Sequence, residues 1–271
     1  LKDAIHLSQS MPIFESMGLN VLIARPYKIQ IGRQIYWIQY FTLDKGENIC
    51  DADRDNIPTH FSELFENIWH HKSENDAFNH LLFSAGMKAR EIQLVRAYTT
   101  YLGQIRFPHS QAYITEALNR YPDITALLVT CFLQKFDPQA TEPDSYLKTI
   151  DILFEKLLDI DSLYDDLIYK RLVNLIQATV RTNYFQTFEK DSDYLSLKFD
   201  SGKIEYLPKP SPRYEIFVYS PRFEGIHLRG GPVARGGIRW SERKEDYRTE
   251  VLGLMKAQMV KNAVIVPAGS K

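Results

Sequence analysis

The sequence is poor in cysteine, with only two such residues among 271. Cys50 and Cys131 lie far apart, each inside an apolar stretch, and no Cys-x-x-Cys or Cys/His spacing accompanies either of them. A disulfide framework and a zinc site are therefore not expected. Both residues are predicted to be buried, reduced thiols of a cytoplasmic protein.

The chain also lacks an excess of charge of either sign, because 33 basic residues face 34 acidic ones. A nucleic-acid or membrane-surface binder needs a basic excess, so neither partner is expected. The longest apolar run, Ile124 to Leu133, is interrupted by threonines and is too short to cross a bilayer. No signal peptide is visible, and a cytoplasmic location is predicted.

What the chain does contain is a high share of hydrophobic residues, 44%, which is enough to build a real core. The length suggests about two domains. The sequence begins at Leu1 rather than at a methionine, and it stops at Lys271 without a terminating pattern. Both ends are interpreted as cuts in a longer polypeptide.

The predicted fold class is α+β, in three successive parts. Residues 1–50 read as a helix that Gly18 ends and a hairpin, which together predict a partial α/β regulatory module. Residues 51–190 predict a bundle of helices that begin near Thr59, Ser73 or Asp76, Ser110, Asp123, Asp144 and Ser162. The second of these is expected to run to Gly103, and the last to Tyr184.

Residues 191–271 change in character. Strands are expected at 194–199, 202–207, 214–219 and 225–228. A helix is expected after Asp246, running to about Asn262, with a buried strand at 263–266 behind it. These strands and helices make up the third predicted part of the chain, residues 191–271.

A glycine-rich segment in this third part is the first candidate site. Two glycine pairs, Gly230-Gly231 and Gly236-Gly237, bracket Arg235, and paired glycines let the backbone approach a ligand closely. The segment matches neither a phosphate-binding Walker loop nor the G-x-G-x-x-G of dinucleotide-binding domains. On spacing alone, a tight connection between strands is the favoured interpretation of this segment.

The helix after Asp246 carries the second candidate site. At about 100° per residue, Leu254, Gln258 and Lys261 fall on one stripe, and Leu254 is expected to face inward. An amide and an ammonium would then share a stripe with an apolar anchor. The alternative is an ordinary lysine that snorkels at a helix C-terminus, and Lys271 alone could equally be a surface residue.

The order of these motifs adds a family resemblance. The segment PRFEGIHLRGGPVARGGIRWSERKEDYRTEVLGLMKAQMVKNAVIVPAGSK resembles the start of the catalytic region of the large NAD-specific glutamate dehydrogenases. The helical stretch LLFSAGMKAREIQLVRAYTTYLGQIRF is similar more diffusely, and GLNVLIARPYKI resembles the last ACT-like regulatory module of that class. The resemblance implies that this chain is an internal piece of such an enzyme.

Residue by residue, the resemblance implies one catalytic group and four substrate contacts. Lys271 matches the catalytic lysine. Gln258 and Lys261 match the residues that hold the substrate α-carboxylate. Arg235 stands where smaller glutamate enzymes place a lysine for the side-chain carboxylate, and Gly236 stands where a backbone group approaches the substrate. A guanidinium group still pairs with a carboxylate, so an arginine at position 235 keeps a positive charge for the substrate side chain. The distance that its side chain spans differs from that of a lysine.

The implied reaction is the NAD-dependent oxidative deamination of L-glutamate to 2-oxoglutarate and ammonia, with NAD bound by a domain absent from this chain. The resemblance also implies a homo-oligomer and a small-molecule effector at the ACT-like region. No metal is expected. The alternative is a non-catalytic ACT-like and helical module, for regulation or oligomerisation, whose substrate motif is degenerate.

Overall fold

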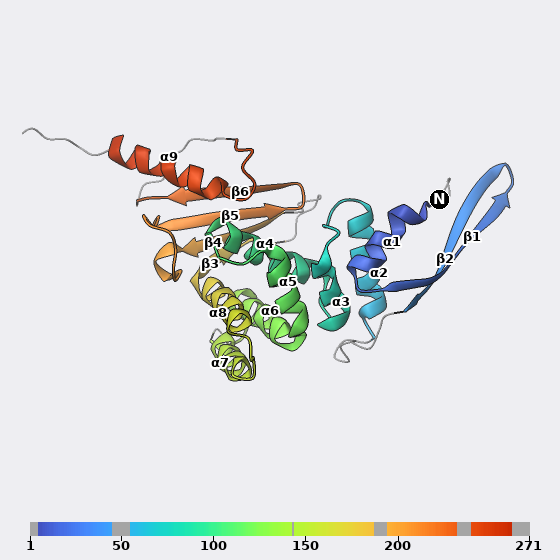
Figure 1. Cartoon of the computed structure of the whole chain (residues 1–271), viewed down its shortest axis with the longest axis horizontal. Helices are drawn as coiled ribbons and strands as arrows, with labels where there is room; N and C mark the ends of the chain where they lie inside the picture. The colour runs from blue at the N-terminus through green and yellow to red at the C-terminus, as the bar shows by residue number, and fades with distance from the viewer. Residues whose placement is uncertain (1–4, 45–54, 143, 187–193, 232–239, 262–271) are drawn as a thin grey trace, which may run out of the picture. The chain divides into compact units, whose positions relative to one another are not determined.

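The computed structural model describes residues 5–44, 55–142, 144–186, 194–231 and 240–261 (Figure 1). Within them the chain is mixed α and β, with helices and two small antiparallel sheets, which confirms the predicted fold class. Two compact units make up the chain, residues 1–96 with 112–130 and residues 97–111 with 131–271. Of the described helices, none is long and apolar enough to cross a membrane.

The first unit contains a helix, a long two-stranded ribbon and further helices. Its elements are α1 (Leu7–Ser16), β1 (Asn20–Ile31), β2 (Gln34–Asp44), α2 (Ile57–Trp69), η1 (Ala77–His80), α3 (Leu81–Ser84), most of α5 (Gln111–Arg120), and the first parts of α4 (Ala89–Gln104) and α6 (Pro122–Phe136). Gly18, with φ +77°, ends α1 as predicted. Pro26 lies inside β1 opposite Gln39, a place that a strand without a second neighbour tolerates.

The prediction of a single helix that runs to Gly103 is wrong. The structure has three successive helical elements in its place, η1, α3 and α4. Asp76 does start the first piece, and its carboxylate accepts a hydrogen bond from the Phe78 N–H at 3.1 Å. The break falls at Gly86, which has φ +67°, and the Met87 N–H beyond it donates to the Leu81 carbonyl. A left-handed glycine in this position ends a helix, and the apolar periodicity on both sides conceals the break.

The second unit joins helices to a four-stranded sheet. Its complete elements are α7 (Ser145–Leu157), α8 (Leu163–Ala178), β3 (Thr179–Thr182), β4 (Leu195–Asp200), η2 (Ser201–Lys203), β5 (Tyr214–Ser220), β6 (Phe223–Arg229) and α9 (Tyr247–Lys261). The sheet order is β3-β4-β5-β6, and every pair is antiparallel. Ser162 begins α8 as predicted, since its hydroxyl accepts a hydrogen bond from the Asp165 N–H.

Two expectations for this unit are wrong. The helix expected to reach Tyr184 ends at Ala178, because the segment Thr179–Thr182, in which three of four residues are β-branched, pairs with β4 instead. The expected strand at 202–207 does not form. Asn174 of α8 accepts from the Glu205 N–H and donates to the Lys203 carbonyl, so α8 satisfies the polar backbone groups that a sheet ladder would otherwise pair.

One face of the sheet forms the core of this unit. Leu195, Leu197 and Phe199 alternate along β4 and are fully buried. Tyr101 of α4 stacks on Phe199, with ring centroids 4.4 Å apart. On the same face, α9 packs against β6 through a small apolar cluster, Leu228, Leu252, Met255, Ile226 and Val251. The sheet and α4 therefore set the position of α9, the helix that carries the candidate residues.

Candidate functional site

The five predicted site residues divide between described and undescribed parts of the chain. Arg235, Gly236 and Lys271 lie outside the described residues. Gln258 lies on α9 and is exposed, and Lys261 is the last residue of α9, with its side chain outside the described part. The structure therefore brings Gln258 and Lys261 onto one helix, one turn apart. It does not test the other three positions.

The expected inward orientation of Leu254 is wrong, since this side chain is 42% exposed. The buried face of α9 is instead formed by Arg248, Leu252 and Met255, at steps of four and three residues. At about 100° per residue, the stripe of Leu254, Gln258 and Lys261 lies roughly 120° around the helix from this face. The candidate residues thus lie on a helix face that is not packed against the sheet.

A buried polar cluster holds the first turn of α9. Arg248 is 1% exposed and its partner Glu215, on β5, is fully buried. The Arg248 Nε donates to Glu215 Oε2 at 2.8 Å, and Nη2 donates to Oε1, which gives a two-pronged pair. The hydroxyl of Tyr101 donates to the same Oε2 at 2.8 Å. We call Tyr101, Glu215 and Arg248 the anchor cluster.

The electrostatics of the anchor cluster follow from its burial. Burial raises the pKa of Tyr101 well above its ordinary value, and the negative charge of Glu215 raises it further. Burial alone would lower the pKa of Arg248, but the hydrogen bonds and charge of Glu215 outweigh it and raise the pKa. Tyr101 therefore stays a neutral hydrogen-bond donor and Arg248 stays a cation across the physiological pH range.

Further polar contacts tie the same part of α9 to its surroundings. Gln104 of α4 accepts from the Arg248 backbone N–H at 3.2 Å and donates to the Lys244 carbonyl at 2.6 Å. The carboxylate of Asp246 pairs with Arg243, and the Ser241 hydroxyl donates to Glu250 at 2.8 Å. The stretch between the glycine-rich segment and α9 is thus hydrogen-bonded along its length.

The anchor cluster is not among the predicted site residues, although one signal for it is present in the sequence. Glu215 stands on β5 in the same alternation as Phe217 and Tyr219, so a period of two places its carboxylate among buried side chains. A buried acid needs a cationic or donor partner. No pattern in the sequence identifies Arg248 or Tyr101 as that partner, because they come from distant helices.

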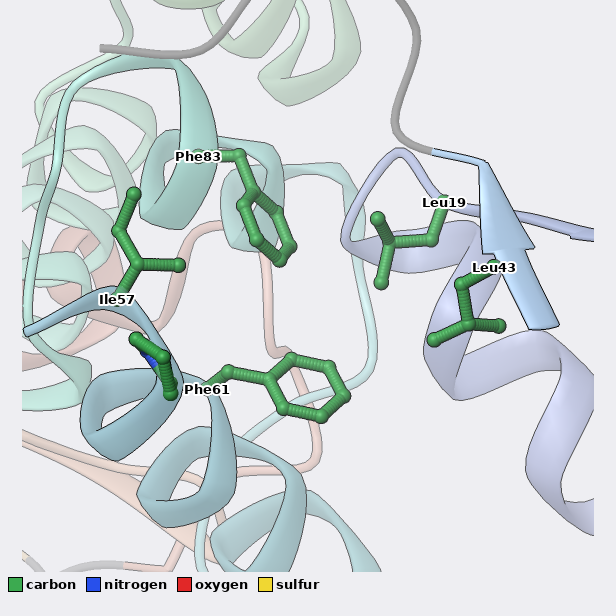
Figure 2. Close-up of a pocket in the computed structure, with 6 residues that line it drawn as sticks. Leu19, Leu43, Ile57, Phe61 and Phe83 are labelled. Carbon is green, nitrogen blue, oxygen red and sulfur yellow. The ribbon is translucent and has the colours of Figure 1, made fainter. Parts of the chain in front are cut away.

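A separate hollow lies in the first unit, and Figure 2 shows the side chains around it. Its volume is about 240 Å³, and its walls are Leu19, Leu43, Ile57, Pro58, Phe61 and Phe83. These residues are all apolar, so the hollow offers no charged group to a dicarboxylate substrate. In the described part of the chain, no group of His, Cys, Asp and Glu is arranged to hold a metal ion.

Comparison with known families gives three matches along the chain. Residues 1–57 match the model of the glutamate dehydrogenase ACT3 domain, and residues 73–138 match that of glutamate dehydrogenase helical motif 3. Residues 152–271 match the model of the bacterial NAD-glutamate dehydrogenase catalytic domain. The matches follow the predicted order of regulatory, helical and catalytic parts, while the boundaries at 50 and 190 stay predictions.

Individual relatives match almost the whole chain. The chain is 47% identical to an NAD-specific glutamate dehydrogenase of Halomonas elongata over 270 residues, 45% identical to one of Pseudomonas aeruginosa over 275, and 44% identical to one of Mycobacterium tuberculosis over 276. Each alignment covers 98% of this chain but 17% of the relative. The chain therefore belongs to the family of large NAD-specific glutamate dehydrogenases, and it spans about a sixth of the length of these relatives.

Proposed function

We propose that the chain is part of an NAD-dependent glutamate dehydrogenase that converts L-glutamate to 2-oxoglutarate and ammonia. The observation that carries the proposal is the match of residues 152–271 to the catalytic-domain model. Relatives that are 44–47% identical over 98% of the chain, all named NAD-specific glutamate dehydrogenases, support it. Because the chain spans only 17% of each of them, the activity is proposed for the longer enzyme.

The proposed substrate contacts follow from the charge of glutamate. A dicarboxylate needs at least two cations or equivalent donors in its site. Gln258 and Lys261 would hold the α-carboxylate, and their positions one turn apart on α9 support this pairing. Arg235 would pair with the side-chain carboxylate, while the backbone at Gly236 would approach the substrate.

Lys271 is the proposed acid–base group. Its ammonium would hydrogen-bond to the substrate atom where charge develops, and its amine form would accept a proton from the attacking water or amine. Cations gathered around one substrate disfavour each other's charged forms, and this favours proton exchange by a lysine near neutral pH.

The described residues give no support for a site for NAD within them. Dinucleotide sites are built on parallel strands with a G-x-G-x-x-G turn, whereas the sequence lacks that motif and the described sheet is wholly antiparallel. We therefore propose that NAD, the oxidant of the reaction, is bound by a part of the enzyme outside these residues. A cytoplasmic homo-oligomer with an effector at the ACT-like region is proposed on the resemblance alone.

The test is glutamate-dependent formation of NADH by the purified full-length protein. Turnover with glutamate and NAD is expected, together with its loss in a Lys271→Met variant. A folded full-length protein without turnover under any condition would instead favour the non-catalytic regulatory module. Dependence on NADP rather than NAD would refute the proposed cofactor while leaving the reaction class intact.

A further inference from the structure

The first turn of α9 is attached to the sheet by directional polar contacts, not by apolar packing alone. The apolar contacts of Leu252 and Met255 against Leu228 hold the helix close to β6. Such contacts are non-directional, so they permit small rotations of a helix about its axis. The paired hydrogen bonds from Arg248 to Glu215 do not permit them, because guanidinium and carboxylate must stay in one plane and in one register.

Tyr101 completes this attachment from α4. Its hydroxyl donates to the same Glu215 oxygen that Arg248 Nε contacts, so it orients the carboxylate that receives the arginine. Its ring is held independently by stacking on Phe199. Tyr101 of α4 thus orients the carboxylate of Glu215, and this carboxylate in turn fixes Arg248 of α9.

A small change in the direction of α9 at Arg248 produces a large displacement at the far end of the helix. Gln258 follows Arg248 by ten residues, which corresponds to roughly 15 Å along a helix that rises 1.5 Å per residue. A tilt of about 10° at Arg248 therefore displaces Gln258 by roughly 2–3 Å, and Lys261 by slightly more. A displacement of this size is enough to break a hydrogen bond to the substrate, because such bonds form only over roughly 2.7–3.2 Å between heavy atoms.

We infer that the anchor cluster of Tyr101, Glu215 and Arg248 is a positioning device that sets the direction and rotation of α9, and through it the place of Gln258 and Lys261 at the substrate α-carboxylate. The inference rests on the proposed function for the identity of the substrate. Its structural part, the control of α9 by Tyr101, stands independently of that function.

The choice of a buried ion pair supports this inference. Well-packed apolar side chains of similar volume often stabilise a fold as well as a buried ion pair does, so stability alone does not require Glu215 and Arg248 in these places. What the pair adds over apolar contact is a fixed mutual geometry. That geometry is useful where a helix must present side chains precisely.

The test uses Tyr101→Phe in the full-length enzyme, because this change removes one hydroxyl and keeps the stacked ring. We expect the KM for glutamate to rise about tenfold, since contacts to the α-carboxylate act on the ground state and the transition state alike. The KM for NAD and kcat should change less than about twofold. Arg248→Lys, which cannot form the paired contact, should change the KM for glutamate in the same direction and further.

The matched control is Tyr98→Phe. Tyr98 lies one turn earlier on α4, is 3% exposed, and shares a hydrogen bond of 2.7 Å with the Thr179 hydroxyl on β3. The Tyr98→Phe variant therefore loses a hydrogen bond of an equally buried hydroxyl, but this hydrogen bond is not directed to α9. We expect a similar fall in thermal stability for the two tyrosine variants, but an unchanged KM for glutamate in Tyr98→Phe.

A second readout is hydrogen exchange of the α9 amides in the same full-length proteins, which requires no activity. Exchange in residues 247–258 should be faster in Tyr101→Phe than in Tyr98→Phe. Equal exchange and equal KM values in the two variants would overturn the inference. Faster exchange in α9 in an enzyme that does not act on glutamate would support the anchoring and refute only the proposed function.

Discussion

Burial determines the chemistry of the one described cysteine, Cys131. Its side chain is 1% exposed, and burial raises the pKa of the thiol to about 12. At pH 8 only about one thiol in ten thousand is then ionised, and the thiolate is the reactive form. This agrees with the predicted buried, reduced cysteine.

We therefore expect Cys131 to resist alkylation by iodoacetamide at pH 8 until the protein is unfolded. A Cys50→Ser variant removes the second thiol, so the modification can be counted by mass spectrometry. The same reaction in urea should be complete within the time that leaves the folded protein unmodified. Rapid modification under native conditions would show that the region around Cys131 opens readily.

Arg235 gives a residue-scale prediction about selectivity in the full-length enzyme. A cation at this position is useful only if the substrate side chain ends in a carboxylate. Arg235→Leu should lower kcat/KM for glutamate by at least about tenfold, or about 1.4 kcal/mol. The loss for norvaline, which has no side-chain charge, should be much smaller.

The alternative for Arg235 is that it only braces the glycine-rich connection. Both substrates would then lose activity equally. Steady-state kinetics with the two amino acids separate these roles, and an equal loss would remove Arg235 from the substrate site.

At the scale of elements, two glycines near α4 predict opposite effects of one substitution. Gly86 has φ +67°, which an alanine adopts only with strain, so Gly86→Ala should destabilise the fold by about 1 kcal/mol. Gly103 lies in α4, where an added Cβ would meet nothing within 4 Å apart from the adjacent residues and the backbone of the helix itself, so Gly103→Ala should stabilise the fold by up to about 1 kcal/mol. Urea unfolding of the chain measures both, and changes of the same sign would contradict this account.

Local signals predicted many element boundaries correctly, and long-range pairing explains the errors at the end of α8 and at residues 202–207. The cap at Ser162 and the glycine end of α1 at Gly18 involve only neighbouring residues, so the sequence reveals them. The segment after Gly202 alternates like a strand, but its backbone is bound by Asn174 of α8. Such a partner cannot be identified from the segment itself.

The orientation of α9 in the candidate site also depends on a distant partner that the sequence of the helix does not reveal. Sequence spacing correctly placed Gln258 and Lys261 on one helix, but it assigned Leu254 to the inner face. The inner face is decided by Arg248, whose partner Glu215 lies 33 residues earlier on a different element. A periodicity argument treats an arginine as outward-facing and therefore selects the wrong side.

At the scale of the whole molecule, the chain taken alone predicts an absence of turnover. These 271 residues carry no dinucleotide fingerprint, and the described sheet is wholly antiparallel. The isolated chain should therefore form no NADH from glutamate and NAD, even at high protein concentration. NADH formation that tracks the purified chain through a final chromatographic step would contradict the proposed location of NAD outside these residues.

The division of the chain into two units has a consequence for how such a protein can be altered by recombination. The chain passes from one unit to the other within α4, again at the start of α5, and a third time within α6. A single crossover in the gene therefore cannot exchange one unit while leaving the other intact, and two of the three passages lie inside continuous helices. The two units are consequently expected to be inherited together, because a chimaera joined at any one of these points mixes the two parents within at least one of the two hydrophobic cores.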